Sequence, residues 1–419
     1  MSGRRAVQVE RLSVYLDLDG TSRPLGTLAW SREERRAYFE FQRDFLANPL
    51  PVSPFKLATT PGVIPASYGP FDGLHGLFSD SLPDGWGQKL LDRRLQAGGL
   101  DYRALTPLDR LAYVGSLGMG ALRYEPEKLF GQRSSVGINL DVIAEQADQV
   151  QREVATADIS VLLRAQGGSG GVRPKLMIGL STDGDHALAD SGADLPPGFA
   201  RWIVKFRSLD ETAGIGAEEY AYSLMARAAG IEMAETRLIE TPKGRYFATR
   251  RFDRSPVGRH HVHTASGLLE TSHKVPGIGY DELLKLTLIL TRDMTHVGQM
   301  FRRMAFNVLA HNRDDHARNH AFLMSSTGVW TPSPAYDLTF SSGPAGEHNL
   351  TILGEGRAPG RKHMLELARK IGLPRGEAEA IITDIADTVA RWPAFADQAG
   401  LTRSRSAEIS SVIARLAAR

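Results

Sequence analysis

Residues 311–323 read HNRDDHARNHAFL and place two carboxylates and three histidines within ten positions. The residues before this segment are apolar at helical spacing: Met300, Phe301, Met304, Ala305, Val308 and Leu309. That pattern predicts a buried helix that ends near Ala310 and a polar loop that begins at His311. The polar side chains are therefore expected on a loop that a rigid helix supports.

Two short strands are predicted after this loop, in HAFLM at residues 320–324 and in GVWTPSPAYDL at residues 328–338. The hairpin would bring Asp314, Asn319 and Asp337 together at one end. Asp314 and Asn319 are five positions apart, as are the catalytic Asp and the metal-binding Asn of the protein-kinase loop H-R-D-x-x-x-x-N. In phosphoryl transfer, one carboxylate accepts the proton of the attacking hydroxyl, while the amide oxygen and a second carboxylate hold Mg²⁺.

The same loop allows other interpretations. His311, His316 and His320 would form a zinc cluster, although their spacing matches no common zinc site. The carboxylates would otherwise only cap the helix and the turn. We interpret His316 as a brace that stabilises the loop by hydrogen bonding.

A candidate phosphate-binding cation lies in RWIVKFRS, residues 201–208. Strand alternation puts Trp202 on the apolar packing face and Lys205 on the opposite face, where it can reach nucleotide phosphates. Glu219, on the predicted helix that follows, is expected to pair with Lys205 as an acidic helix residue does in protein kinases. Its neighbour Glu218 would face elsewhere. The alternative is a surface lysine on an edge strand.

A glycine-rich segment, GGSGGVRPK, precedes that strand at residues 167–175. Glycines allow the backbone N–H groups to approach a phosphate closely. The segment is not a Walker A loop, because Lys175 is followed by Leu176, and it also lacks the G-x-G-x-x-G dinucleotide pattern. By itself it is typical of a flexible connection.

Composition narrows the class of protein. No cysteine is present, which excludes disulfides, thiolate metal sites and a cysteine nucleophile. The formal net charge of +2 does not indicate a nucleic-acid-binding protein. The arginine-rich residues 401–419 would form either a DNA-contacting face or the solvated end of an amphipathic helix. The sequence has no secretory h-region and no run near the roughly 18 apolar residues of a membrane span. We expect a soluble cytoplasmic protein.

Three regions are predicted along the chain, and together they indicate an α+β fold. Residues 1–130 alternate short strands with a helix. Residues 131–255 contain strands around the glycine-rich segment, a hairpin at STDGDH and a helix. Residues 256–419 are dominated by helical periodicity.

The motifs occur in the order GGSGGVRPK, WIVKF, EEYAYSLMARAAGI, RRFDR, DDHARNHAFL and SPAYDL. Together with SLPDGWGQKLL at residues 81–91, they resemble the HipA family of bacterial serine/threonine kinases, the toxins of HipA–HipB modules. The resemblance covers nearly the whole chain. It implies a two-lobed kinase-like fold with a HipA-type N-terminal subdomain at residues 1–130, an N-lobe at residues 131–255 and a helical C-lobe at residues 256–419.

The resemblance also implies roles for individual residues, with ATP and Mg²⁺ as cofactors. Asp314 would be the catalytic base, Asn319 and Asp337 the metal ligands, and Glu219 a supporting residue. The RRFDR segment would form the adenine-side hinge, with Phe252 packing near the base or simply in the core beside a salt-bridged Asp253. The candidate nucleotide-binding residues are Gly170, Gly171, Val172, Arg173, Pro174, Lys175, Lys205, Arg250, Arg251, Phe252 and His316.

Two positions depart from the family pattern. The family autophosphorylates a loop serine, which implies Ser169 as the regulatory site, yet aligning Lys175 with the family lysine puts Gly168 at the usual serine position. Arg251 stands where an acidic residue can precede the Phe-Asp of the hinge.

The resemblance further implies partners. These are a helix-turn-helix antitoxin, operator DNA contacted mainly through it, and a protein substrate such as an aminoacyl-tRNA synthetase, whose phosphorylation arrests growth. Two alternatives stay open, namely a catalytically silent co-repressor scaffold with a kinase fold and a metal-dependent phosphohydrolase.

Overall fold

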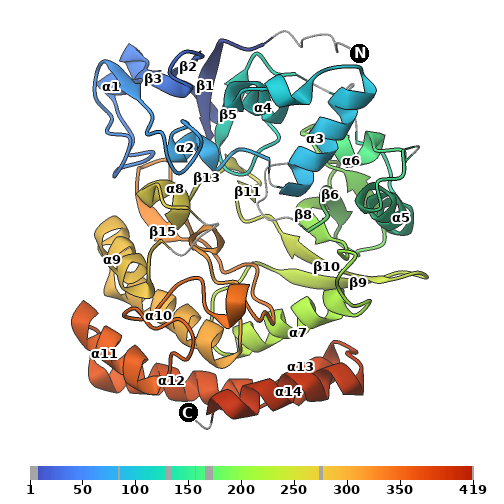
Figure 1. Cartoon of the computed structure of the whole chain (residues 1–419), viewed down its shortest axis with the longest axis vertical. Coiled ribbons are helices and arrows are strands. Elements are labelled where there is room, and N and C mark those ends of the chain that lie inside the picture. The colour runs from blue at the N-terminus through green and yellow to red at the C-terminus, as the bar shows by residue number, and fades with distance from the viewer. Residues whose placement is uncertain are drawn as a thin grey trace.

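The computed structural model describes residues 8–83, 85–128, 130, 135–155, 157–165, 173–272 and 277–417. In Figure 1 the N-terminal strands lie at the top, a second sheet lies at the centre right, and the last helices lie across the bottom. The chain thus combines separate sheet and helix layers, as an α+β fold does.

The first sheet is antiparallel, in the strand order β4-β3-β2-β1-β5. Its strands are β1 (Arg11–Leu18), β2 (Thr21–Ser31), β3 (Arg36–Phe41), β4 (Val63–Pro65) and β5 (Leu122–Glu125). Alternate residues of β1 are buried, so one face of the sheet packs on the core. Helices α1 (Arg43–Ala47), α2 (Gly76–Ser79), α3 (Gly85–Ala97) and α4 (Pro107–Val114) accompany it.

The second sheet is also antiparallel, in the order β7-β6-β8-β10-β9. Its strands are β6 (Lys175–Ser181), β7 (Ala187–Ala189), β8 (Phe199–Lys205), β9 (Thr236–Glu240) and β10 (Arg245–Arg250). Helices α5 (Leu140–Gln151), α6 (Ser160–Arg164) and α7 (Ile215–Ala228) belong to this part of the chain. The predicted hairpin is present as β6 and β7. Strand β8 is central, so Lys205 does not lie on an edge strand.

The predicted helix before the polar loop is α10 (Met294–Leu309), and Ala310 is its C-cap. The predicted hairpin after the loop is β14 (Ala321–Met324) with β15 (Trp330–Pro332), and β13 (His261–Thr264) completes this sheet. The remaining helices are α8 (Ala265–Leu269), α9 (Tyr280–Thr291), α11 (Arg361–Ile371), α12 (Arg375–Val389), α13 (Trp392–Gln398) and α14 (Arg403–Ala417).

Two hydrophobic cores form, and they cut across the three predicted regions. One core joins the first sheet to α7 and to the helices of the last third of the chain. The other joins the second sheet to α5 and α6, and it includes Trp86 and Leu90 of α3. The N-terminal sheet therefore shares its core with the C-terminal helices, while the boundaries of the three regions stay a prediction.

The arginine-rich C-terminal segment is helix α14, whose Ile409 and Ile413 are buried. Its Arg405 donates hydrogen bonds from Nε (2.8 Å) and Nη2 (3.2 Å) to the buried carboxylate of Glu218. This helix is packed against the rest of the fold. Within the described ranges, no helix has the length and apolar character needed to cross a bilayer.

Candidate active site

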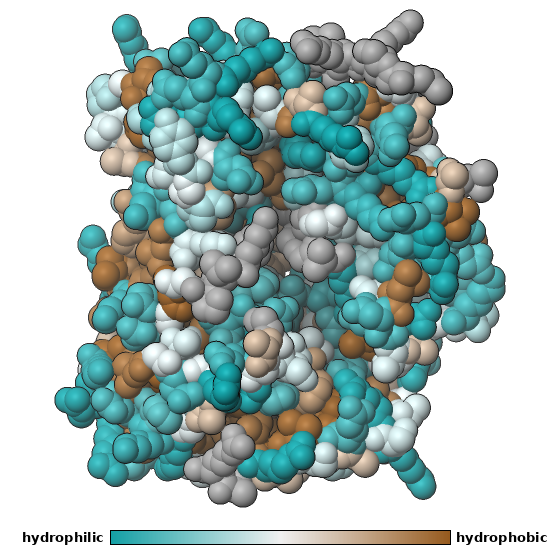
Figure 2. Space-filling model, viewed as in Figure 1, coloured by the Kyte–Doolittle hydropathy of each residue, from teal (hydrophilic) through white to brown (hydrophobic). Residues whose placement is uncertain are grey.

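A pocket forms where the two sheets and the polar loop meet. Its lining residues come from the first part of the chain, the second sheet, the hinge after β10, and the loop after α10. They include Asp80, Lys175, Lys205, Arg250, Arg251, Phe252, His316, Asn319, Tyr336 and Asp337. Figure 2 shows that the molecule is hollowed near the middle of this face. Most of the predicted site residues in the described ranges thus line one cavity.

Lys205 is the centre of the charged cluster in this pocket. Its Nζ donates to Glu219 Oε1 at 2.7 Å and to Asp337 Oδ1 at 2.5 Å, although the three residues lie far apart in sequence. Strand β8 and helix α7 supply the first two, and the chain after β15 supplies Asp337. The neighbouring carboxylates raise the pKa of Lys205 against the opposing effect of burial, so the amine stays charged.

Asp337 has a backbone φ of +53°, in the left-handed region that few non-glycine residues adopt. Lys205, and secondarily Lys175, lower the pKa of its carboxyl from the ordinary 3.8 to about 2, against the effect of burial. The carboxylate is therefore anionic at neutral pH, and it interacts electrostatically with Lys205 and Lys175.

Asp314 lies at the start of the loop, and its side chain is exposed. The protein around it reduces its solvation, which raises the pKa of its carboxyl. The nearby carboxylates of Asp337 and Asp315 raise this pKa further, whereas His316 lowers it. A raised pKa brings a carboxylate closer to the range in which it accepts a proton efficiently. Asn319 Nδ2 donates to the main-chain oxygen of Asp314 at 2.8 Å, which ties the two predicted residues together.

The second carboxylate of the pair, Asp315, holds the loop in place. It is 1% exposed and accepts hydrogen bonds from Tyr280 Oη (2.7 Å), His348 Nδ1 (2.9 Å) and the backbone N–H of Asn349 (2.9 Å). Tyr280 Oη in turn accepts from Asn307 Nδ2 of α10 at 2.9 Å. Sequence reasoning missed these braces, because their partners lie up to 35 positions away and carry no local pattern.

Magnesium fits the donor set that the loop and hairpin present. Mg²⁺ prefers oxygen ligands, usually one or two carboxylates together with water and substrate phosphates. The Asp337 carboxylate and the amide oxygen of Asn319, whose Nδ2 is already committed to Asp314, are such donors. Across the described parts of the chain, no three His, Asp or Glu side chains gather as a metal site, so phosphates and water would have to complete the coordination.

The histidines of the loop do not form the alternative zinc cluster within the described structure. Burial lowers the pKa of His311 to about 4 and that of His320 to about 3, so both are neutral packing residues at pH 7. His316 lines the pocket beside Asn319 instead. Its proximity lowers the pKa of Asp337 and partly offsets the rise in the pKa of Asp314.

The glycine-rich segment is only partly described. Ser169, Gly170, Gly171 and Val172 lie outside the described residues. Arg173 Nε donates to the Phe206 carbonyl at 2.9 Å, and its guanidinium pairs with Glu219 and Glu211. Pro174 accepts from the Phe206 N–H at 2.8 Å, and Lys175 is buried at the pocket wall, opposite Lys205 in the β6–β8 register. In this arrangement Arg173 braces Glu219.

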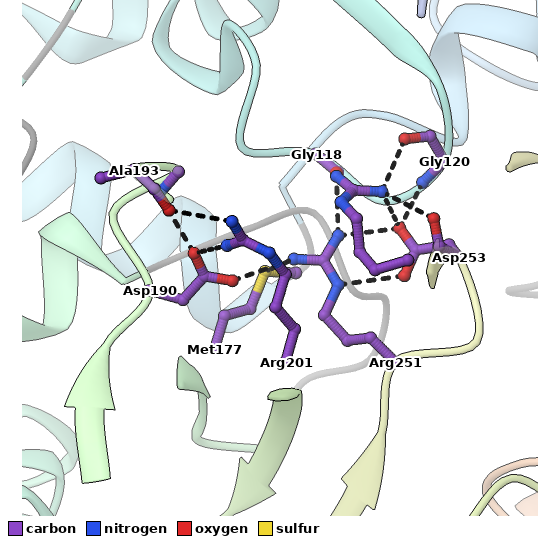
Figure 3. Close-up of polar contacts among 10 residues, drawn as sticks. Gly118, Gly120, Met177, Asp190, Ala193, Arg201, Arg251 and Asp253 are labelled. Atoms are coloured by element: carbon purple, nitrogen blue, oxygen red, sulfur yellow. Dashed lines mark hydrogen bonds and ion pairs between the residues drawn. The ribbon is translucent and has the colours of Figure 1, made fainter. Parts of the chain in front are cut away.

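At the hinge, Phe252 lines the pocket with its ring centroid 5.7 Å from that of Tyr336. Arg250 is exposed and pairs with Glu235 at 3.3 Å. Arg251 is 4% exposed, and its guanidinium donates to Asp253 rather than standing free for a nucleotide (Figure 3). Asp253 thus forms salt bridges, as expected if Phe252 of RRFDR packs in the core beside a salt-bridged aspartate.

The N-terminal region contributes a wall of the pocket that the sequence did not reveal. Asp80 accepts from His263 Nδ1 at 2.6 Å, from the Thr264 N–H at 2.7 Å and from Thr264 Oγ1 at 2.8 Å. Arg318, in the polar loop after α10, donates to the Ser79 carbonyl at 3.0 Å. The nearest sequence signal was the adjacent motif SLPDGWGQKLL at residues 81–91, which contributed to the family resemblance but assigned no role to Asp80.

Comparisons with known proteins agree with this geometry. The family model described as HipA N-terminal domain matches residues 14–125, and the HipA-like C-terminal domain matches residues 167–392. The solved structure of HipA from Shewanella oneidensis MR-1, in complex with HipB and its operator DNA, has a TM-score of 0.69 to this chain at 19% identity, over 97% of this chain and 96% of that one. That likeness confirms the predicted two-lobed, kinase-like α+β fold.

A curated relative from Sinorhizobium fredii, Y4dM, is named as an inferred kinase. It is 27% identical over 151 residues, which are 33% of this chain and 36% of the relative. The match therefore spans about a third of the length of that protein.

Proposed function

Because this chain belongs to the HipA family, we propose that it is an ATP- and Mg²⁺-dependent serine/threonine protein kinase, the toxin of a toxin–antitoxin module. The observation that carries the proposal is the Lys205 amine held between Glu219 and Asp337, in a pocket that Asn319 also lines. A phosphate-binding cation, its helix partner and a metal-binding carboxylate are the parts that phosphoryl transfer requires.

In the proposed reaction, Lys205 contacts the nucleotide phosphates and Glu219 fixes the position of its amine. Asp314 accepts the proton as the substrate hydroxyl oxygen attacks the γ-phosphorus, and the bond from that phosphorus to the bridging oxygen of ADP breaks. Asp337 and Asn319 would hold Mg²⁺, which neutralises phosphate charge when it is bound. Phe252 packs near the adenine, and the Asp315 braces keep Asp314 in place.

Partners and regulation belong to the same proposal. We assign Ser169 as the site of autophosphorylation and an aminoacyl-tRNA synthetase as the protein substrate, so that blocked tRNA charging arrests growth. The regulatory partner would be a HipB-like helix-turn-helix antitoxin, which contacts operator DNA. The fold likeness to a HipA protein solved together with HipB and operator DNA supports this choice of partner.

The test is the intact mass of the purified protein after incubation with ATP and Mg²⁺, beside Asp314→Asn and Ser169→Ala variants. We expect the parent to gain one phosphate and both variants to gain none. A parent that gains no phosphate and phosphorylates no member of a synthetase panel would instead support a catalytically silent scaffold. Phosphate gain in Ser169→Ala but not in Asp314→Asn would keep the kinase and move the regulatory site.

A further inference from the structure

A second cavity lies next to the first, and Arg250 and Arg251 of the hinge line both. Five arginines line it: Arg201 of β8, Arg250, Arg251 and Arg254 of the hinge, and Arg259 of the short strand β12 (Gly258–Arg259). We call this cavity the arginine pocket. Arg201 precedes Lys205 by four positions on β8, so the two lie on the same face of the strand about 13 Å apart.

The carboxylates of the arginine pocket do not balance its guanidinium groups. Figure 3 shows Asp190 paired with Arg201 and, farther away, with Arg251, while Asp253 lies on the other side of Arg251. Asp253 also accepts from Arg254, and it is completely buried. Four inner arginines thus share two inner carboxylates, while the fifth arginine, Arg250, pairs with Glu235 at 3.3 Å and Asp194 is exposed at the rim.

Three of these arginines have structural partners that explain their presence. Arg251 Nη2 and Arg254 Nη2 both donate to the Gly118 carbonyl, at 3.2 and 2.9 Å, and so fasten the N-terminal region to the hinge. Arg201 pairs with Asp190 and donates to the Ala193 carbonyl at 2.8 Å.

Arg259 is different, because its buried Nη1 has no hydrogen-bond partner within the described structure. The carboxylate that attracts it most, Asp17, is already bound to Arg123 Nε at 3.1 Å and to Ser22 Oγ at 2.6 Å. Burial lowers the pKa of Arg259, and repulsion from neighbouring arginines acts in the same direction. A buried N–H donor without a partner costs stability, so this partly buried guanidinium gains when an acceptor is added.

We propose that the arginine pocket binds a small molecule bearing a phosphate monoester, with Arg259 as its principal ligand. A phosphate monoester carries nearly two negative charges at neutral pH, which suits a cavity where guanidinium groups outnumber carboxylates. Guanidinium groups bind phosphate oxygens through paired N–H donors, and a concave site between loops suits a small molecule. The site does not depend on the activity proposed above.

Isothermal titration calorimetry at constant ionic strength tests this assignment with ribose 5-phosphate, and with ribose as the phosphate-free control. We expect the parent to bind the phosphate ester and not ribose. Arg259→Gln should weaken binding at least tenfold. The matched control is Arg302→Gln, which removes a partly buried arginine bonded to the Ala229 carbonyl at 2.9 Å outside both pockets, and it should bind as the parent does.

Two further measurements separate phosphate binding at Arg259 from binding in the nucleotide pocket and from a purely structural role of this arginine. Binding should persist in Lys205→Met, because a loss there would place the phosphate in the nucleotide pocket and overturn the assignment. The melting temperature of unliganded Arg259→Gln should equal or exceed that of the parent, since the substitution removes a guanidinium whose buried Nη1 has no partner within the described structure. A clear decrease would identify Arg259 as a purely structural residue, and equal binding by Arg259→Gln and the parent would refute the site.

Discussion

Replacing Glu219 with Gln removes the charge that holds Lys205 and Arg173 together. Glu219 is 2% exposed, and its two carboxylate oxygens accept from the Lys205 amine (2.7 Å) and from the Arg173 guanidinium. The glutamine keeps the size of the side chain and one oxygen acceptor. The variant therefore isolates the contribution of the charge.

The expected loss of stability follows from the contacts that remain. Breaking a buried ion pair by removing one partner costs about 3–5 kcal/mol. Here Lys205 keeps Asp337, and Arg173 keeps Glu211 at 3.2 Å and the Phe206 carbonyl at 2.9 Å. We therefore expect the lower end of that range, about 3 kcal/mol, in the free energy of unfolding measured with urea.

The adjacent residue provides the matched control. Glu218 is completely buried on the same helix, but it pairs with Arg405 of α14, away from the nucleotide pocket. Glu218→Gln should lose a comparable free energy of unfolding while keeping its phosphorylation rate at temperatures where it is folded. Glu219→Gln should lose roughly 100-fold in kcat/KM for ATP, because the amine is no longer positioned against the phosphates. Equal kcat/KM values for the two variants would refute the role of Glu219 as a positioning residue.

Three other predictions concern the pocket. Asp314→Asn should abolish phosphoryl transfer. It should keep or raise the free energy of unfolding at pH 7, because a carboxyl whose pKa the fold raises destabilises the folded state when it is ionised. A large loss of stability would contradict this prediction. Asp337, with its pKa lowered to about 2, should contribute about 2 kcal/mol of stability that is present above about pH 4 and lost as the pH falls toward 2. Urea titrations from pH 5 to pH 2 should show that loss in the parent and not in Asp337→Asn. Phe252→Ala should weaken ATP binding by about 1–2 kcal/mol, or roughly 5- to 30-fold in Kd by calorimetry, and an unchanged Kd would place the adenine elsewhere.

Much of the local structure around the site followed from periodicity. The apolar spacing from Met300 to Leu309 predicted α10 and its end, and the alternation in RWIVKFRS predicted which face of β8 carries Lys205. The first pattern records the burial of a helix face, and the second records strand alternation, which places Trp202 and Val204 in the core and Lys205 in the pocket wall.

The braces and the walls of the site were not predictable in this way. Asp315, the neighbour of the candidate base, is fixed by Tyr280 and His348, and Asp80 reaches the pocket wall from the N-terminal region. Such contacts depend on tertiary packing between distant segments. Likewise, the position of Arg251 in the motif indicated a nucleotide contact, whereas its guanidinium is occupied by Asp253.

The most direct test of the central claim is the fate of the γ-phosphate when γ-labelled ATP and Mg²⁺ are incubated with the parent and with Asp314→Asn. A kinase predicts label on protein, in the chain itself or in an added synthetase, and none with Asp314→Asn. Label released only as inorganic phosphate would identify a phosphohydrolase and contradict the account, as would equal labelling by Asp314→Asn.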